Sequence, residues 1–172
     1  VVLFGDSHAA QWFTALSVSA EKGQIRLDDR TKDGCPPASI QVPRYPQCEV
    51  WRRGVIADIA ASKPALILLG SYARYYVAHD DRPADHWRDA LARTIAQFSP
   101  QSRVAILADT PSAGVSRPIC LGLFLDDALR CAIPRGSAFD AAVQHAERDL
   151  TADGTVRYLD YARYLCDESI CP

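Results

Sequence analysis

Short apolar runs alternate along this chain with segments whose apolar residues recur at helical spacing. Continuous apolar runs of about four to eight residues are typical of strands that are buried on both faces. The predicted strands are Val1–Phe4, Gln24–Leu27, Pro64–Leu69, Val104–Ala108 and Val156–Leu159. The predicted helices are Ser7–Glu21, Cys48–Ser62, Pro83–Phe98 and a last helix that ends near Leu150, capped by Ser137 with Asp140 as its capping-box partner.

This alternation predicts an α/β fold, a three-layer α/β/α sandwich with a mostly parallel sheet and helices on both faces. Two long loops are predicted, over residues 31–48 and 111–135. In sheets of this kind, ligands bind beyond the carboxyl ends of the strands. The polar turns Gly5–Ser7, Gly70–Ser71 and Asp109–Thr110 each follow a predicted strand, so we expect them to share one edge.

The composition is that of a globular domain with no nucleic-acid partner. Apolar residues make up 48% of the 172 residues, and the formal net charge is −2. No apolar run approaches the roughly 20 residues that a membrane span needs. The chain has no methionine and begins inside a predicted strand. We therefore expect a single domain over residues 1–172 that is a fragment or a processed piece of a longer protein.

Six cysteines predict a fold that is stapled by disulfides. Their spacing favours pairing between sequential neighbours, Cys35–Cys48, Cys120–Cys131 and Cys166–Cys171. No CxxC pair or Cys/His cluster supports the alternative of a zinc site, so we expect no metal and no other cofactor. Disulfides in this number indicate an oxidising compartment, such as the periplasm or the cell exterior.

The turn after the first predicted strand carries the most specific candidate chemistry. Gly5-Asp6-Ser7 places a serine at the carboxyl edge of the sheet and at the start of a helix. There the backbone N–H of the serine can face the oxygen on which an attacked carbonyl gathers negative charge. Ser7 is therefore a candidate nucleophile. The alternative is a serine that only caps the helix.

Several further motifs occur in a specific order over essentially the whole chain. They are Gly5-Asp6-Ser7-His8-Ala9 followed by Trp12, Cys35-Pro36-Pro37, Cys48 with Trp51, Asp109-Thr110-Pro111 with Cys120, and Tyr164-Leu165-Cys166-Asp167 with Cys171-Pro172. In these motifs the chain resembles SGNH (GDSL-like) hydrolases, and more specifically the extracytoplasmic SGNH domains fused to acyltransferase-3 membrane proteins. The resemblance implies the flavodoxin-like SGNH hydrolase fold and a serine-dependent bacterial O-acyltransferase. Such a domain transfers an acyl group from an acyl-serine to a hydroxyl group of a glycan. The acyl group that the resemblance implies is acetyl.

The resemblance also implies partners and a location. An acyl donor supplies the group through the membrane acyltransferase-3 domain of the parent chain, and a cell-surface or secreted glycan accepts it. The domain then lies on the periplasmic or external face of the bacterial inner membrane. The sequence leaves the oligomeric state open.

Carried over by position, the resemblance assigns Ser7 as the nucleophile and one oxyanion donor, and Gly34 as a candidate second donor. The third donor of the family is an asparagine side chain, but this chain contains no asparagine. Gly70, Ser71 and Arg74 occupy the corresponding loop. Of these, Arg74 is the residue that can stabilise negative charge instead.

The catalytic base that Ser7 needs is missing from this set of residues. The Asp-x-x-His motif of the family does not occur here, and we expect it in the parent protein beyond Pro172. His8 follows Ser7 directly, but helical neighbours point about 100° apart, which favours a supporting or substrate-contacting role over that of a base. Asp6 is predicted to hold the turn. Asp109 is predicted to orient a base, bind a sugar hydroxyl or form a turn.

Three tyrosines, Tyr72, Tyr75 and Tyr76, follow Gly70-Ser71 closely. Aromatic faces beside an active edge suit sugar binding, although such residues also pack at the rim of a core. Two alternatives to acyl transfer stay open: a carbohydrate acetyl esterase that uses the same serine, and a non-catalytic glycan-binding domain that lacks a complete triad.

Overall fold

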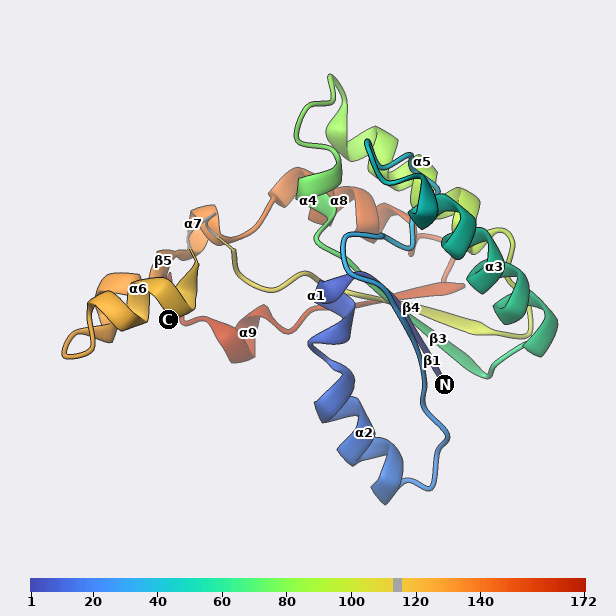
Figure 1. Cartoon of the computed structure of the whole chain (residues 1–172), viewed down its shortest axis with the longest axis horizontal. Helices are drawn as coiled ribbons and strands as arrows, with labels where there is room; N and C mark the ends of the chain where they lie inside the picture. The colour runs from blue at the N-terminus through green and yellow to red at the C-terminus, as the bar shows by residue number, and fades with distance from the viewer. Residues whose placement is uncertain (113–115) are drawn as a thin grey trace.

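The protein is described by a computed structural model over residues 1–112 and 116–172. Five strands form one sheet in the order β2-β1-β3-β4-β6, and every neighbouring pair is parallel. They are β1 (Val2–Gly5), β2 (Asp28–Thr31), β3 (Leu66–Gly70), β4 (Arg103–Leu107) and β6 (Val156–Leu159). The sheet and its flanking helices confirm the predicted α/β fold class (Figure 1).

Helices lie on both faces of the sheet (Figure 1). One face carries the larger hydrophobic core, to which α3 (Pro46–Ser62), α5 (Pro83–Ile95) and α8 (Ala141–Asp149) contribute. On the other face, α1 (Ser7–Ala10) and α2 (Phe13–Lys22) cover a smaller cluster. The second face is therefore covered less completely than the first.

The alternation of side chains along each strand explains the two cores. Successive residues of a strand point to opposite faces of the sheet. Phe4 and Leu69 accordingly enter the larger cluster, whereas Leu3 and Leu68 enter the smaller one. All four side chains are buried. Because both faces of the central strands are covered, these strands read as continuous apolar runs in the sequence.

A small lobe extends from one end of the sheet (Figure 1). Its short elements are α6 (Arg117–Leu123), the 3-10 helix η1 (Ala128–Cys131), β5 (Ile133–Pro134), α7 (Arg135–Ala138) and β7 (Ile170–Cys171), and α9 (Ala162–Leu165) leads into it from the sheet. β5 and β7 pair antiparallel. The loop predicted over 111–135 is therefore partly wrong, because its described part carries α6, η1 and β5. Residues 113–115 of that prediction lie outside the described residues.

All three predicted disulfides are present. The S–S distances are 1.97 Å for Cys35–Cys48, 2.00 Å for Cys120–Cys131 and 2.05 Å for Cys166–Cys171. Closing the two longer loops stabilises the fold by roughly 3 kcal/mol each if the effect is entropic. Within the described residues, no helix combines the length and apolarity needed to cross a bilayer.

The second strand lies further along the chain than predicted. The prediction placed it at Gln24–Leu27, whereas β2 covers Asp28–Thr31. Gln24 has a φ of 52°, in the left-handed region that an extended strand excludes. The charged residues of β2 are accommodated because it is an edge strand that pairs only with β1.

The helix predicted over Ser7–Glu21 is interrupted at Gln11 and Trp12. In an unbroken helix the Trp12 N–H would donate to the carbonyl oxygen of His8. It donates instead to Ala9 O at 3.0 Å, and the Gln11 side-chain amide donates to His8 O at 2.9 Å. The side chain of Gln11 thus replaces the backbone bond and separates α1 from α2.

The last long helix begins after Asp140 rather than at Ser137. The Asp140 carboxylate accepts the Val143 N–H at 3.1 Å and caps α8. Ser137 lies within the short helix α7, where its hydroxyl donates to Pro134 O. The predicted N-cap was therefore wrong by three residues. Asp140, which was predicted to be the capping-box partner of Ser137, is itself the N-cap.

Candidate active site

The carboxyl ends of β1, β3 and β4 bring three polar turns to one edge of the sheet. Gly5 of β1 pairs with Gly70 of β3, and Gly70 pairs with Leu107 of β4. The turns that begin at Asp6, Ser71 and Asp109 therefore leave the sheet side by side. This arrangement confirms that the three turns share one edge.

Two glycines allow α1 to lie directly on the strand ends. A Cβ on Gly5 would collide with the carbonyl oxygen of Gly70. A Cβ on Gly70 would lie 3.0 Å from both the Cα and the Cβ of Ala9 in α1. Larger residues would push α1 away from the sheet and displace Ser7. Gly70, a predicted member of the oxyanion region, therefore has a packing role in this structure.

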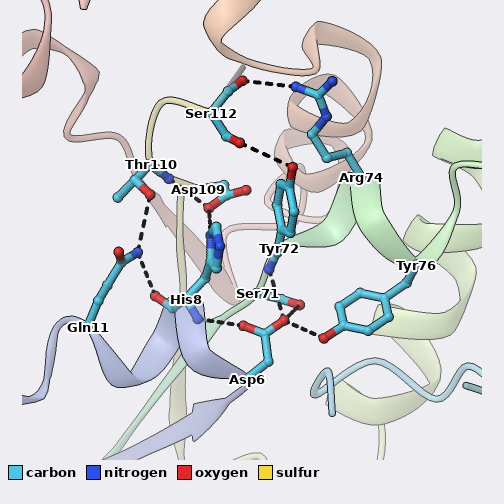
Figure 2. Close-up of polar contacts among 10 residues, drawn as sticks. All are labelled: Asp6, His8, Gln11, Ser71, Tyr72, Arg74, Tyr76, Asp109, Thr110 and Ser112. Carbon is cyan, nitrogen blue, oxygen red and sulfur yellow. Dashed lines mark hydrogen bonds and ion pairs between the residues drawn. The ribbon is translucent and has the colours of Figure 1, made fainter. Parts of the chain in front are cut away.

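The carboxylate of Asp6 joins the turns after β1 and β3. It is 1% exposed and accepts four hydrogen bonds. Oδ1 accepts the His8 N–H at 2.8 Å, and Oδ2 accepts the Ser71 hydroxyl at 2.9 Å, the Tyr72 N–H at 3.0 Å and the Tyr76 hydroxyl at 2.8 Å (Figure 2). A buried carboxylate is tolerated when its lone pairs are filled in this way. Asp6 thus fixes the turn that carries Ser7.

Tyr76 is the last residue of the short helix α4 (Ala73–Tyr76), and Tyr72 directly precedes this helix. Burial, and then the negative charge of Asp6, raise the pKa of the Tyr76 hydroxyl. This hydroxyl therefore stays protonated and acts as a donor to Asp6. The Tyr72 hydroxyl forms a 3.1 Å hydrogen bond with Ser112, which links α4 to the loop after β4.

His8 pairs with Asp109 from the turn after β4. His8 Nδ1 and Asp109 Oδ1 are 2.6 Å apart, and the Tyr72 ring stacks on the imidazole with centroids 4.4 Å apart (Figure 2). Burial lowers the pKa of His8, but the hydrogen bond to Asp109 and the charges of Asp109 and Asp6 outweigh it and raise the pKa. Burial raises the pKa of Asp109, although His8 opposes it. Both partners therefore hold a proton more tightly than they would in water.

Ser7 is the first residue of α1, and it is exposed. Asp6 caps this helix by accepting the His8 N–H, so capping does not account for Ser7. Within the described part of the chain, neither the N–H nor the hydroxyl of Ser7 has a hydrogen-bond partner. Both groups are therefore available to a substrate at the sheet edge.

The other predicted site residues occupy different places. Ser71 is buried, and its hydroxyl donates to Asp6. Arg74 donates to Ser112 O at 3.1 Å and so supports the loop after β4 (Figure 2). Gly34 has a φ of 66° in the loop that follows β2. No hydrogen bond among the described residues joins Gly34 or Arg74 to Ser7.

Two residues near the site were not predicted. The Gln11 amide bridges His8 O and the Thr110 hydroxyl, at 2.9 and 3.3 Å. Glu147 of α8 lines a cavity of about 20 Å³ together with Asp109 and Arg74. Burial raises the pKa of Glu147 to about 7, and its carboxylate accepts the Trp87 Nε1–H at 2.9 Å. A charged residue in an amphipathic helix gives no sequence signal of such burial.

The structure resembles the periplasmic domain of a lipopolysaccharide acetyltransferase of Salmonella ser. Paratyphi A, with a TM-score of 0.75. The two chains are 20% identical, and the similarity covers 99% of this chain and 69% of the other. A likeness at this identity shows the fold. No curated protein matches the chain. The family model for SGNH domains fused to AT3 domains matches residues 1–172. The chain therefore belongs to the family of SGNH domains fused to AT3 domains, in agreement with the motifs of its sequence.

Proposed function

We propose that this domain transfers an acetyl group through acyl-Ser7 to a hydroxyl group of a glycan. The observation that carries this proposal is an exposed serine at the carboxyl edge of the sheet, with its N–H and hydroxyl both available. The buried carboxylate of Asp6 fixes the turn on which this serine stands. Membership of a family fused to AT3 domains supports acyl transfer, and the acetyltransferase neighbour supports acetyl as the group.

In the first half of the reaction, Ser7 Oγ attacks the acyl carbon of the donor, and its proton passes to a base. The Ser7 N–H donates to the oxyanion that forms. Collapse expels the donor's leaving group, which takes the proton from the base, and an acyl ester remains on Ser7. In the second half, the glycan hydroxyl loses its proton to the base and attacks the same carbon. Ser7 Oγ then leaves and recovers that proton.

The base in this proposal belongs to an Asp-x-x-His motif outside these 172 residues, as the family resemblance implies. Nδ1 of His8 is occupied by Asp109, and no hydrogen bond among the described residues joins its ring to the Ser7 hydroxyl. A serine without a base is a weak nucleophile. We therefore expect efficient acyl transfer only from the parent protein.

We further propose that the domain works outside the cytoplasm and receives its acyl group from a membrane AT3 domain of the same chain. The three disulfides support an oxidising compartment. The name of the structural neighbour, a periplasmic domain, agrees with that location.

Ser7→Ala in the full-length parent protein tests the nucleophile. With p-nitrophenyl acetate as donor, the wild type should release p-nitrophenol and yield an acetylated Ser7 peptide in mass spectrometry. Ser7→Ala should lose both, whereas Ser19→Ala, which removes another exposed serine hydroxyl, should keep both. Turnover that survives Ser7→Ala would show that the assignment is wrong. An acyl-serine that reacts only with water, whatever glycan is added, would indicate an esterase.

A further inference from the structure

A groove of about 570 Å³ is lined in part by Tyr76, whose hydroxyl donates to Asp6 in the turn of Ser7. We call it the tyrosine groove. Residues 40–43 form one wall, and Tyr75, Tyr76, His79, Asp80 and Asp81 form the other. Sites for small molecules commonly enclose roughly 300 to 1,000 Å³. The groove is therefore large enough for a sugar residue.

Both groove tyrosines contact residues that flank Ser7 in the sequence. The Tyr76 hydroxyl donates to Asp6 Oδ2 at 2.8 Å, and Figure 2 shows this side chain pointing to the turn of Asp6. Tyr75 stacks with Tyr72 at a centroid distance of 6.0 Å, and Tyr72 stacks in turn on His8 at 4.4 Å. The groove is therefore connected to both residues that flank Ser7, to Asp6 by a hydrogen bond and to His8 by a continuous series of aromatic rings.

The opposite wall is held rigidly. Arg52 is 3% exposed and donates to Ile40 O at 2.8 Å and to Pro36 O at 3.4 Å. The Ser39 N–H donates to Ala90 O at 3.0 Å, which ties the same segment to α5. The Cys35–Cys48 disulfide closes the loop that carries this wall. A wall fixed before binding reduces the entropy that a ligand must lose.

The groove offers one large exposed aromatic ring. Tyr75 is 65% exposed, and its ring is held by edge contact with Tyr76 at 5.3 Å. A fixed aromatic ring gains free energy when an apolar ligand face covers it. The C–H face of a pyranose is such a surface, and its hydroxyls can bond to the polar groups of Gln41, His79 and Asp81.

The charge of the lining residues selects against anions. Asp80 and Asp81 contribute carboxylates, and no lysine or arginine lines the groove among the described residues. Asp80 already accepts the Arg82 N–H and contacts His86, so Asp81 is the carboxylate available to a ligand. Carboxylates accept hydrogen bonds from hydroxyls but repel phosphate or uronate groups.

We propose that the tyrosine groove is the acceptor site and that a neutral sugar residue stacks on Tyr75 there. This inference rests on the proposed function, because it assumes that a hydroxyl of the bound sugar reaches acyl-Ser7. It adds the class of acceptor, a neutral pyranose rather than a charged one, and the side chain that recognises it.

Sugar binding can be measured without catalysis by saturation-transfer difference NMR on the full-length protein. The probes are the methyl α-glycosides of glucose, galactose, mannose and rhamnose. At least one should bind the wild type, and Tyr75→Ala should weaken that binding about fivefold to tenfold, since an aromatic contact of this kind contributes about 1 kcal/mol. Tyr75→Phe, which keeps the ring, should bind within about twofold of the wild type.

Tyr164→Ala is the matched control, because Tyr164 is 69% exposed on α9 and lies outside the groove. It should bind the sugar like the wild type. The proposal is overturned if no glycoside binds, if Tyr75→Ala binds like the wild type, or if glucose 6-phosphate binds more tightly than methyl glucoside. Failure of the proposed function gives a different result: no acetyl-Ser7 would form, while sugar binding would still depend on Tyr75.

Discussion

Nδ1 of His8 and Oδ1 of Asp109 lie 2.6 Å apart, although 101 positions separate the two residues in the sequence. The parallel pairing of β1, β3 and β4 brings them together, because each residue follows the carboxyl end of a strand. His8 directly follows Ser7 in the chain. Its protonation therefore sets the charge next to the proposed nucleophile.

Asp109→Asn should lower the pKa of His8. The substitution removes the negative charge and the strong hydrogen bond that raise this pKa, so the opposing effect of burial becomes dominant. An NMR titration of the imidazole Cε1–H signals measures the shift. An unchanged midpoint for His8 would show that Asp109 does not control its charge.

Glu147→Gln should stabilise the domain increasingly as the pH rises. The pKa of Glu147 is raised from 4.5 to about 7 in the folded state. The folded protein thus binds this proton more tightly than the unfolded chain, and stability falls as the pH rises between those two values. Glutamine cannot ionise and still offers an oxygen to Trp87. The gain in the free energy of unfolding, relative to the wild type, should approach roughly 3 kcal/mol at about pH 8 and vanish near pH 4.

Urea unfolding at several pH values measures this difference. Glu168→Gln, which removes a carboxylate at an exposed position, is the matched control variant. If Glu147→Gln gains as much at low pH as at high pH, ionisation of Glu147 is not the cause.

Asp6→Asn should destabilise the fold by about 2 to 4 kcal/mol. Four donors point at this carboxylate, and an amide NH₂ in place of one oxygen would face donors instead of accepting from them. Chemical unfolding monitored by tryptophan fluorescence measures the loss. Asp29→Asn is the control, because Asp29 is exposed and, among the described residues, its carboxylate accepts a single hydrogen bond, from the Thr31 N–H to Oδ1. Equal stabilities of the two variants would contradict the role assigned to Asp6.

Gly5→Ala should lower the free energy of unfolding by more than about 3 kcal/mol, because the added Cβ would collide with the carbonyl of Gly70. Relief of that collision would displace α1, so acylation of Ser7 should fall as well. Thermal unfolding and the yield of acetyl-Ser7 measure the two effects. Gly122→Ala is the control, since in the described part of the chain no atom outside the adjacent residues and the backbone of its own helix lies within 4 Å of a Cβ at Gly122. A stable, fully active Gly5→Ala variant would contradict the packing role assigned to Gly5.

Much of the architecture could be predicted from local patterns. The apolar runs located β1, β3, β4 and β6, because strands buried on both faces must be continuously apolar. The spacing of the cysteines indicated all three disulfides. The prediction misplaced β2 because β2 is an edge strand of charged and polar residues, and such a strand has no apolar pattern in the sequence.

The sequence by itself determined the fold class, the family and the place of Ser7 at the start of a helix, since each depends on short local patterns and on their order along the chain. Only the tertiary structure decided which side chains meet there. Asp6 accepts bonds from residues 65 to 70 positions away, and His8 meets Asp109 across 101. Such contacts follow from the strand order and register of the sheet, which no local pattern specifies. The same pairing brought Tyr76 of α4, which lines the groove, into hydrogen-bond contact with Asp6.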